Sequence, residues 1–207
     1  MEIRKKLYMD CETTGVNPSV HSIWQWAGVI EIDGEVVDQM EVRCRPFNMA
    51  QIEEGALQTC GITREELENY PPPSVMHSKI CAFFSRHVSK FDKNDKLRIV
   101  GYNVGFDVDF LYAFFKRMGD NYLGSYLKTG MGEYYDVLHY VGILWRLGYL
   151  PLPNKKLGTL CKYFGIDIQA HDALSDILAT RQLALKIEKL VTVIKPEEVY
   201  PDVCWQE

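Results

Sequence analysis

The hydrophobic positions of this 207-residue chain first follow the short apolar runs typical of strands. Residues 4–10, 23–32 and 35–45 are rich in β-branched and aromatic residues and are bounded by polar or turn-forming positions. The second and third runs are joined by Asp33 and Gly34, a two-residue sequence that favours a tight hairpin. We therefore expect the chain to begin with an antiparallel meander.

Later in the chain the apolar spacing becomes mainly helical. After the prolines at 71–73, apolar residues and one histidine recur at helical spacing: Met76, Ile80, Phe83, Phe84, His87 and Phe91. Short strands are predicted at 97–101 and near 134–136. Further helices are predicted at 106–118, 138–147, 156–164 and 173–190. Strands followed by helices predict an α/β architecture.

A connection with several glycines separates the helix at 106–118 from the strand near 134–136. The glycines are Gly119, Gly124, Gly130 and Gly132. A connection of this length is either an insertion or lid with a function of its own, or a plain surface loop. The sequence leaves both interpretations open.

Composition limits the architecture and the cellular setting. With 47% hydrophobic residues, the chain is long enough for one well-buried domain, which we assign to residues 1–190, followed by a tail at 191–207. The six cysteines form no CxxC pair, and no apolar leader or run of about 18 apolar residues appears. We expect an intracellular, cytoplasmic protein with reduced thiols and no membrane contact.

The net charge of −5 argues against a long surface that follows a nucleic-acid duplex. It argues less against an enzyme that holds only the end of a strand, because few phosphates are then contacted. Bound divalent cations would also supply positive charge where a phosphate has to react.

Asp10 and Glu12 are two residues apart in a predicted strand that continues from 4–10. Alternate residues of a strand face the same side, so the two carboxylates share one surface. Like charges at close range repel, and their desolvation is costly unless a positive charge compensates. The pair therefore predicts a divalent cation.

Two further acids begin apolar stripes on predicted helices. Asp107 is in helical register with Leu111, Phe114 and Met118. Asp176 is in the same register with Thr180, Leu183, Ile187 and Leu190. Either acid alone is better explained by the helix dipole, which favours acidic residues in the first turn. Together with Asp10 and Glu12, they favour a shared metal site.

Three segments carry a family resemblance: DCETTG at 10–15, NVGFD at 103–107 and HDALSD at 171–176. In order and spacing they resemble the motifs of the DEDDh 3′→5′ exonucleases, the DnaQ-like group that includes the proofreading subunit of bacterial replicative polymerases. GIT at 61–63, Asp136 and KLGTLCKYFGI at 156–166 also resemble that family. The resemblance implies a ribonuclease H-like fold, with a five-stranded mixed sheet flanked by helices, and makes residues 1–190 an exonuclease domain.

The resemblance also implies roles for the acids. Asp10 would bridge two metal ions, with Glu12 and Asp176 completing the shell of the first and Asp107 holding the second. Oxygen ligands favour Mg²⁺ or Mn²⁺ over zinc. His171, five residues before Asp176, resembles the general base of the histidine subgroup, whereas the tyrosine subgroup has Tyr where this chain has Asp172.

Substrate contacts are implied in the same way. Thr13 resembles the residue that meets the terminal 3′ hydroxyl, and Asn103 and Phe106 resemble the groups that fix and wedge the last nucleotides, although Phe106 could also be ordinary core. Cys60 departs from the family, whose members place a polar residue before the glycine of HGIT or NGIT. The grip on the terminal base could therefore differ in this chain.

Four more side chains could either contact the substrate or have a purely structural place. Trp24 and Trp26 share one strand face, where they could stack on bases or fill the core, and we favour the core for at least one of them. Lys155 and Lys156 are candidate phosphate contacts, although a solvated surface explains them equally well.

Three functions remain open. The first is a metal-dependent exonuclease that releases nucleoside monophosphates from the 3′ end of single-stranded DNA. The second is a 3′→5′ exoribonuclease for RNA or short oligonucleotides. The third is a binding module without catalysis, which would require a broken metal site. A polymerase is a candidate partner, and the sequence does not indicate the oligomeric state.

Overall fold

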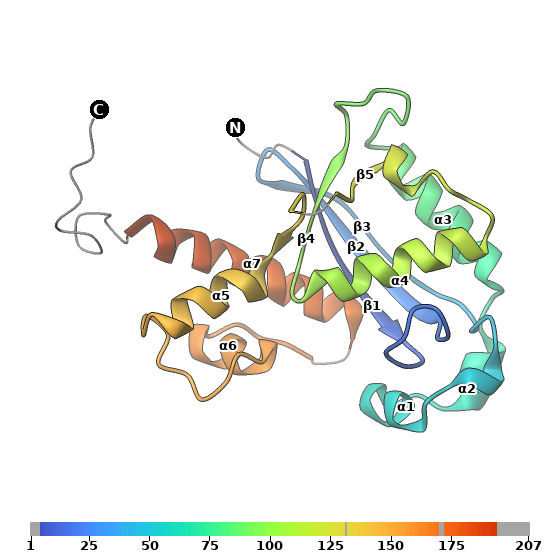
Figure 1. Cartoon of the computed structure of the whole chain (residues 1–207), viewed down its shortest axis with the longest axis horizontal. Helices are drawn as coiled ribbons and strands as arrows, with labels where there is room; N and C mark the ends of the chain where they lie inside the picture. The colour runs from blue at the N-terminus through green and yellow to red at the C-terminus, as the bar shows by residue number, and fades with distance from the viewer. Residues whose placement is uncertain (1–4, 131, 170–171, 194–207) are drawn as a thin grey trace.

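The computed structural model describes residues 5–130, 132–169 and 172–193, and its centre is a mixed sheet (Figure 1). The strands are β1 Lys5–Thr13, β2 Ile23–Ile32, β3 Glu35–Arg43, β4 Leu97–Gly101, β5 Leu127–Lys128 and β6 Tyr135–Asp136. The sheet order is β3-β2-β1-β4-β5, and β6 also pairs with β4. The antiparallel pairs β1·β2 and β2·β3 confirm the predicted meander, and β4 joins β1 in parallel.

Helices cover both faces of this sheet (Figure 1). α3 Pro73–Ser85 and α4 Val104–Arg117 lie on one face, and α5 Val137–Arg146, α6 Leu157–Phe164 and α7 Ala173–Val193 lie on the other. The alternation of β1 produces this division: Leu7, Met9 and Cys11 pack into the α3/α4 core, and Tyr8 packs into the α7 core. Within the described residues, no helix combines the length and the apolar character needed to cross a membrane.

Two short helices that the sequence pattern did not indicate lie at one end of the sheet (Figure 1). They are α1 Glu54–Cys60 and α2 Arg64–Asn69, preceded by the 3₁₀ turn η1 Met49–Gln51. Their apolar residues form a small third core around Trp24, which stacks on Tyr70 with ring centroids 6.3 Å apart. Helices of six or seven residues give too few turns for an apolar period to stand out.

Both tryptophans of β2 are core residues. Trp24 is 4% exposed, and Trp26 is fully buried with edge contacts to Phe83 and Phe84 at centroid distances of 5.8 Å. The preference for core is therefore confirmed, and base stacking by either ring is wrong.

The helix after the prolines is shorter than predicted. It ends at Ser85, and His87 instead bonds through Nε2 to Asp38 at 2.8 Å. Phe91 is 89% exposed, so its apparent helical spacing was coincidental. A polar segment follows the helix. Within it, the Ser89 backbone amide donates a hydrogen bond to the Asp95 carboxylate.

The glycine-containing connection is partly folded onto the core. It contains a 3₁₀ turn, η2 Leu123–Ser125, and strand β5, and Leu123, Tyr126 and Leu127 are buried. A plain surface loop is therefore the wrong description of this part. At the other end of the chain, α7 extends to Val193, so the first residues of the predicted tail are helical. The rest of the tail lies outside the described residues, and the division at 190 stays a prediction.

Candidate active site

Asp10 and Glu12 of β1 meet Asp176 from the first turn of α7. One carboxylate oxygen from each of the three lies within 4.8 Å of the others. The strand places Asp10 and Glu12 on the α7 side of the sheet, because they alternate with residues that face α3 and α4. We call these three residues and Asp107 the carboxylate centre.

Asp107 reaches the same strand from the opposite face. It is 4% exposed, lies in the first turn of α4, and accepts a hydrogen bond from the Cys11 amide at 2.9 Å. Cys11 separates Asp10 from Glu12, so this bond ties the beginning of α4 to the strand segment that carries both acids. The predicted core-side orientation of Asp107 is therefore what the structure shows.

The electrostatics of the carboxylate centre favour a bound cation. Burial raises the pKa of Asp10 well above its ordinary value, and the charges of Asp107, Glu12 and Asp176 raise it further. Burial also raises the pKa of Asp107, although the Cys11 amide acts in the opposite direction. A cation would remove this repulsion, and a donor set made only of carboxylate oxygens suits Mg²⁺ or Mn²⁺.

A cavity of about 390 Å³ opens beside Glu12. Thr13, Cys60 and Phe106 line it, together with further residues of β1, of the loop after it, and of α1 and its N-cap: Cys11, Gly15, Val16, Glu53, Gly55, Ala56 and Thr59. Its volume is within the range of small-ligand sites, about 300 to 1,000 Å³. Three of the four predicted substrate residues thus surround one space next to the carboxylates.

Cys60 bonds directly to the carboxylate centre, a contact that the sequence did not reveal. Its thiol donates to Glu12 Oε2 at 2.9 Å. Burial and the charge of Glu12 raise the pKa of this thiol far above its ordinary value, so it is a neutral donor. Cys60 is the last residue of α1, and Gly61 ends the helix with a left-handed φ of 66°. The unpredicted helix explains why the contact was missed.

Thr13 and the turn after it close one side of the cavity. The Thr13 hydroxyl donates to the Gly15 carbonyl at 2.8 Å. A Cβ at Gly15 would lie 2.5 Å from the His21 ring, so only glycine allows the ring to pack there. The last glycine of DCETTG is therefore required by a close approach of the turn to His21.

Asn103 has a different place from the other three substrate candidates. It is exposed, precedes α4 with a left-handed φ of 59°, and does not line the cavity. Its backbone amide donates a hydrogen bond to Asp136 Oδ1 at 2.9 Å. The same oxygen accepts from the Leu138 amide at 3.0 Å and caps α5. Asp136, which the sequence marked only as a landmark, thus links the beginnings of α4 and α5.

His171 lies outside the described residues, so its predicted role as a base stays a prediction. Its neighbour Asp172 accepts from the Ser175 amide at 2.9 Å and caps the first turn of α7. Lys155 lies over the Trp145 ring, with Nζ 5.6 Å from the centroid. Lys156 precedes α6 and is exposed. Neither lysine lines the cavity beside Glu12.

Comparison with protein families gives a match over residues 7–184, to the family RNase_T, described as exonuclease. This span contains Asp10, Glu12, Asp107 and Asp176 and most of the fold. The chain belongs to this exonuclease family. The predicted resemblance to 3′→5′ exonucleases and the prediction of a nuclease are thus confirmed at the level of the family.

The similar curated proteins are far longer than this member of the exonuclease family. It is 29% identical over 184 residues to the PolC-type DNA polymerase III of Halalkalibacterium halodurans, covering 88% of this chain and 11% of the polymerase. The Bacillus subtilis protein of the same name is 27% identical, over 91% of this chain and 12% of that protein. The chain therefore spans about a tenth of the length of these relatives.

Solved structures of E. coli exonuclease I have the same fold. The zinc-bound complex with single-stranded DNA aligns with a TM-score of 0.73 and 25% identity, covering 94% of this chain and 42% of that chain. The complex with a dT13 oligonucleotide aligns with a TM-score of 0.72 and 24% identity, over 95% and 42% of the two chains. The predicted ribonuclease H-like fold with a mixed sheet flanked by helices is confirmed.

Proposed function

We propose that this chain is a metal-dependent 3′→5′ exonuclease that releases nucleoside monophosphates from the 3′ end of single-stranded DNA. The observation that carries the proposal is the meeting of three carboxylates within 4.8 Å, with buried Asp107 tied to the same strand. Such a donor set matches what two-metal phosphodiester hydrolysis requires, and a ligand-sized cavity adjoins it.

In this proposal Asp10, Glu12, Asp107 and Asp176 hold two divalent cations, Mg²⁺ or Mn²⁺. When bound, such ions favour ionisation of the attacking water and neutralise the charge on the leaving oxygen. The chain's own task is to fix the carboxylates. The Cys11 amide orients Asp107, and the Cys60 thiol orients Glu12. His171 would accept the proton of the attacking water.

Thr13 and Phe106 are suited to hold the strand end. The Thr13 hydroxyl donates to Gly15, which leaves its oxygen lone pairs to accept a hydrogen bond from a free 3′ hydroxyl. Phe106 is half-buried against Phe110, at a centroid distance of 4.7 Å, and gives the cavity an apolar wall for a base. Asn103 would act indirectly, by setting the beginning of α4, and Cys60 by positioning Glu12.

The names of the similar proteins favour DNA over RNA. The curated relatives are DNA polymerases, and exonuclease I has been solved with single-stranded DNA. A polymerase partner is part of the proposal for the same reason. The free cysteines at 11, 44, 60, 81 and 161 agree with an intracellular setting in which such a partner would be found.

Matched DNA and RNA oligonucleotides, each labelled at the 5′ end, test this function. We expect a ladder that shortens from the 3′ end, with Mg²⁺ or Mn²⁺ present and not with EDTA, and faster on DNA. A DNA strand with a 3′ phosphate should be degraded poorly if Thr13 meets a free hydroxyl. Faster digestion of RNA would shift the substrate to RNA, early products from the middle of the strand would exclude an exonuclease, and no cleavage with either metal would favour a binding module.

A further inference from the structure

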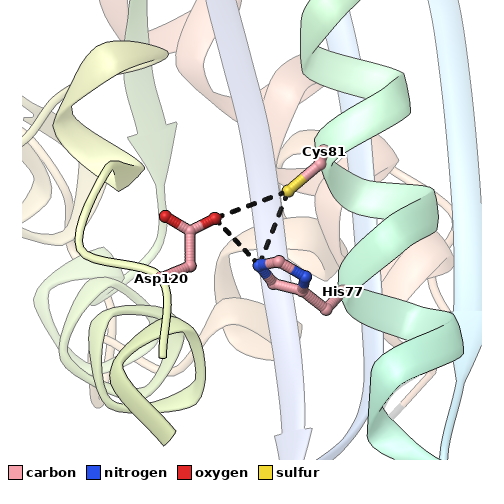
Figure 2. Close-up of side chains that lie close together, drawn as sticks. All are labelled: His77, Cys81 and Asp120. Atoms are coloured by element: carbon pink, nitrogen blue, oxygen red, sulfur yellow. Dashed lines mark hydrogen bonds and ion pairs between the residues drawn. The ribbon is translucent and has the colours of Figure 1, made fainter. Parts of the chain in front are cut away.

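A second group of metal-ligating side chains lies on the α3/α4 side of the sheet, beyond the end of α4 that is opposite Asp107 (Figure 2). His77 and Cys81 are one turn apart on α3, and Asp120 follows the end of α4. Figure 2 shows all three side chains converging. The two α3 residues have the i, i+4 spacing that places side chains on one helix face. We call these residues the His–Cys–Asp cluster.

The distances within this cluster are close to those between the ligand atoms of a tetrahedral metal site. His77 Nε2 lies 3.0 Å from Asp120 Oδ2 and 3.6 Å from Cys81 Sγ, and Cys81 Sγ lies 3.9 Å from Asp120 Oδ2. Zinc bonds of about 2.3 Å to sulfur and about 2.0 to 2.2 Å to nitrogen or oxygen place tetrahedral ligand atoms roughly 3.3 to 3.6 Å apart. One ion therefore fits between the three atoms after side-chain shifts of a few tenths of an ångström.

The donor types select zinc over the ions expected at the carboxylate centre. Zinc, a borderline ion, binds thiolate sulfur, imidazole nitrogen and carboxylate oxygen together, whereas Mg²⁺ and Mn²⁺ prefer oxygen alone. The side chains of His77 and Asp120 are each 19% exposed, so a water molecule can complete the tetrahedron. We propose that the His–Cys–Asp cluster is a zinc site separate from the active site.

The surroundings hold the ligands in position. Asp120 Oδ1 accepts from the Tyr122 amide at 2.8 Å, which leaves Oδ2 facing His77 and Cys81. The Asp120 amide in turn donates to the Phe115 carbonyl at 3.0 Å. The His77 ring packs edge-on against Phe115, with centroids 4.8 Å apart. Hydrogen bonds to a ligand's second atom and an apolar shell are the outer contacts that orient metal ligands.

Zinc binding would exchange the contacts now present for metal bonds. The Cys81 thiol loses its proton to the solvent, and His77 Nε2 must be unprotonated to bind the ion. The ion would then link the middle of α3 to the chain that leaves α4. Because Asp107 lies in the first turn of α4, a link at the other end of that helix would stabilise the element without touching substrate. We assign the site a structural role.

The test uses the full chain carrying Asp10→Ala, so that the carboxylate centre is weakened as a competing zinc site. After incubation with Zn²⁺ and desalting, we expect one zinc per chain by elemental analysis. Replacement with Co²⁺ should give a thiolate-to-cobalt charge-transfer band. Adding Cys81→Ser or His77→Gln should weaken zinc binding at least about tenfold, since loss even of an outer partner costs about 10- to 100-fold. Asp120→Asn provides a third variant if one of these fails to fold.

Two control variants make the result specific. His87→Gln removes an imidazole from another histidine–aspartate pair, His87 with Asp38 at 2.8 Å, and should keep full zinc binding. Cys60→Ser removes the thiol at the carboxylate centre and should also keep it. No bound zinc in the Asp10→Ala chain, or binding lost with Cys60→Ser and kept with Cys81→Ser, would overturn the proposal. The readouts are metal content and absorbance, so neither depends on nuclease activity.

Discussion

The carboxylate centre and the His–Cys–Asp cluster are two groups of ligating side chains with opposite electrostatics. In the carboxylate centre, like charges raise one another's pKa, as at Asp10, and hydrogen bonds from Cys11 and Cys60 offset this only in part. In the His–Cys–Asp cluster, a potential cation and an anion are already 3.0 Å apart. The first group is therefore strained without metal, and the second is satisfied without it.

This difference separates a site selected for chemistry from one suited to stability. Under the proposed function, a group of acids that destabilises the metal-free fold is retained because its ions would act on a substrate. A group whose members satisfy one another can stabilise the fold in either state. Removing one member should therefore have opposite effects on the stability of the metal-free protein in the two groups.

Removing one acid of the carboxylate centre should have the largest effect on activity. Asp10→Ala should lower turnover at least about a thousandfold, because about 4 kcal/mol of transition-state charge stabilisation is lost, at about 1.4 kcal/mol per tenfold. The measurement is single-strand digestion with Mn²⁺, normalised to folded protein. Asp109→Ala is the matched control, since Asp109 is an exposed acid on the same helix as Asp107. Near-parental turnover of the Asp10 variant would refute its role as a metal ligand.

Replacing the proposed base should have the next largest effect. His171→Ala should lose about 10²- to 10⁴-fold in turnover and keep metal and oligonucleotide binding. Parental activity should rise with pH as the imidazole loses its proton, and the variant should lack this rise. Turnover against pH measures both. His139→Ala, at an exposed position on α5, serves as the control. If His171 only packed the loop before α7, stability would fall while turnover per folded molecule stayed the same.

The comparison also shows what sequence can predict. The acids were found because strand alternation and helix periodicity are local properties: Asp10 and Glu12 follow the period of β1, and Asp107 the period of α4. Strand 23–32 was predicted to the residue because its run of apolar residues is also a local signal, bounded by turn-forming positions. The helix register of Asp176 favoured a site shared with these acids, and the family resemblance added the role of each acid toward the two ions.

The sequence could not reveal contacts that depend on short elements. The bond from Cys60 to Glu12 requires α1, whose seven residues show no clear period. Asp120 meets His77 across 43 positions, through the turn after α4, and no local pattern records that distance. Phe91 illustrates the reverse error, in which chance spacing extended a helix beyond Ser85. Long-range meetings of single side chains have to be seen in the structure.

Stability without metal should change in opposite directions in the two groups. In metal-free protein at neutral pH, Asp10→Asn should raise Tm, because it removes the buried carboxyl whose pKa is raised by burial and by the charges of Asp107, Glu12 and Asp176. Asp120→Asn should lower Tm, because it removes the partner of His77, a loss of up to about 1 kcal/mol. For a chain of this size, about 1 kcal/mol corresponds to about 2 to 4 °C. Thermal melts in EDTA measure both changes.

The increase in Tm caused by Asp10→Asn should become larger as pH rises. A carboxyl whose pKa is raised in the folded state favours folding below its unfolded pKa, and this advantage is lost as pH rises through the folded value. The ordinary value for Asp10 is 3.8, so the parent should fall behind the variant progressively as pH rises above that value. Near pH 4 the two melts should converge. A gain that is constant with pH would show that repulsion is not its source.

The smallest effect should come from Cys60, the thiol at the carboxylate centre. Its bond to Glu12 orients a proposed metal ligand, and such a bond contributes about 0.5 to 1.5 kcal/mol. Cys60→Ala should therefore raise the Mn²⁺ concentration needed for half-maximal activity about 2- to 10-fold. Cys60→Ser keeps a donor and should recover most of the loss. Activity titrated against Mn²⁺ at saturating DNA measures this.

Thr59→Ala is the control that separates the effect of the Cys60–Glu12 hydrogen bond from the effect of a changed cavity shape. Thr59 also lines the cavity, but its hydroxyl donates to the Gly55 carbonyl at 2.8 Å. Its loss should change the KM for DNA more than the Mn²⁺ requirement, whereas Cys60→Ala should do the reverse. If both variants shifted only the KM, Cys60 would act as a wall of the cavity, and Glu12 would not depend on the thiol.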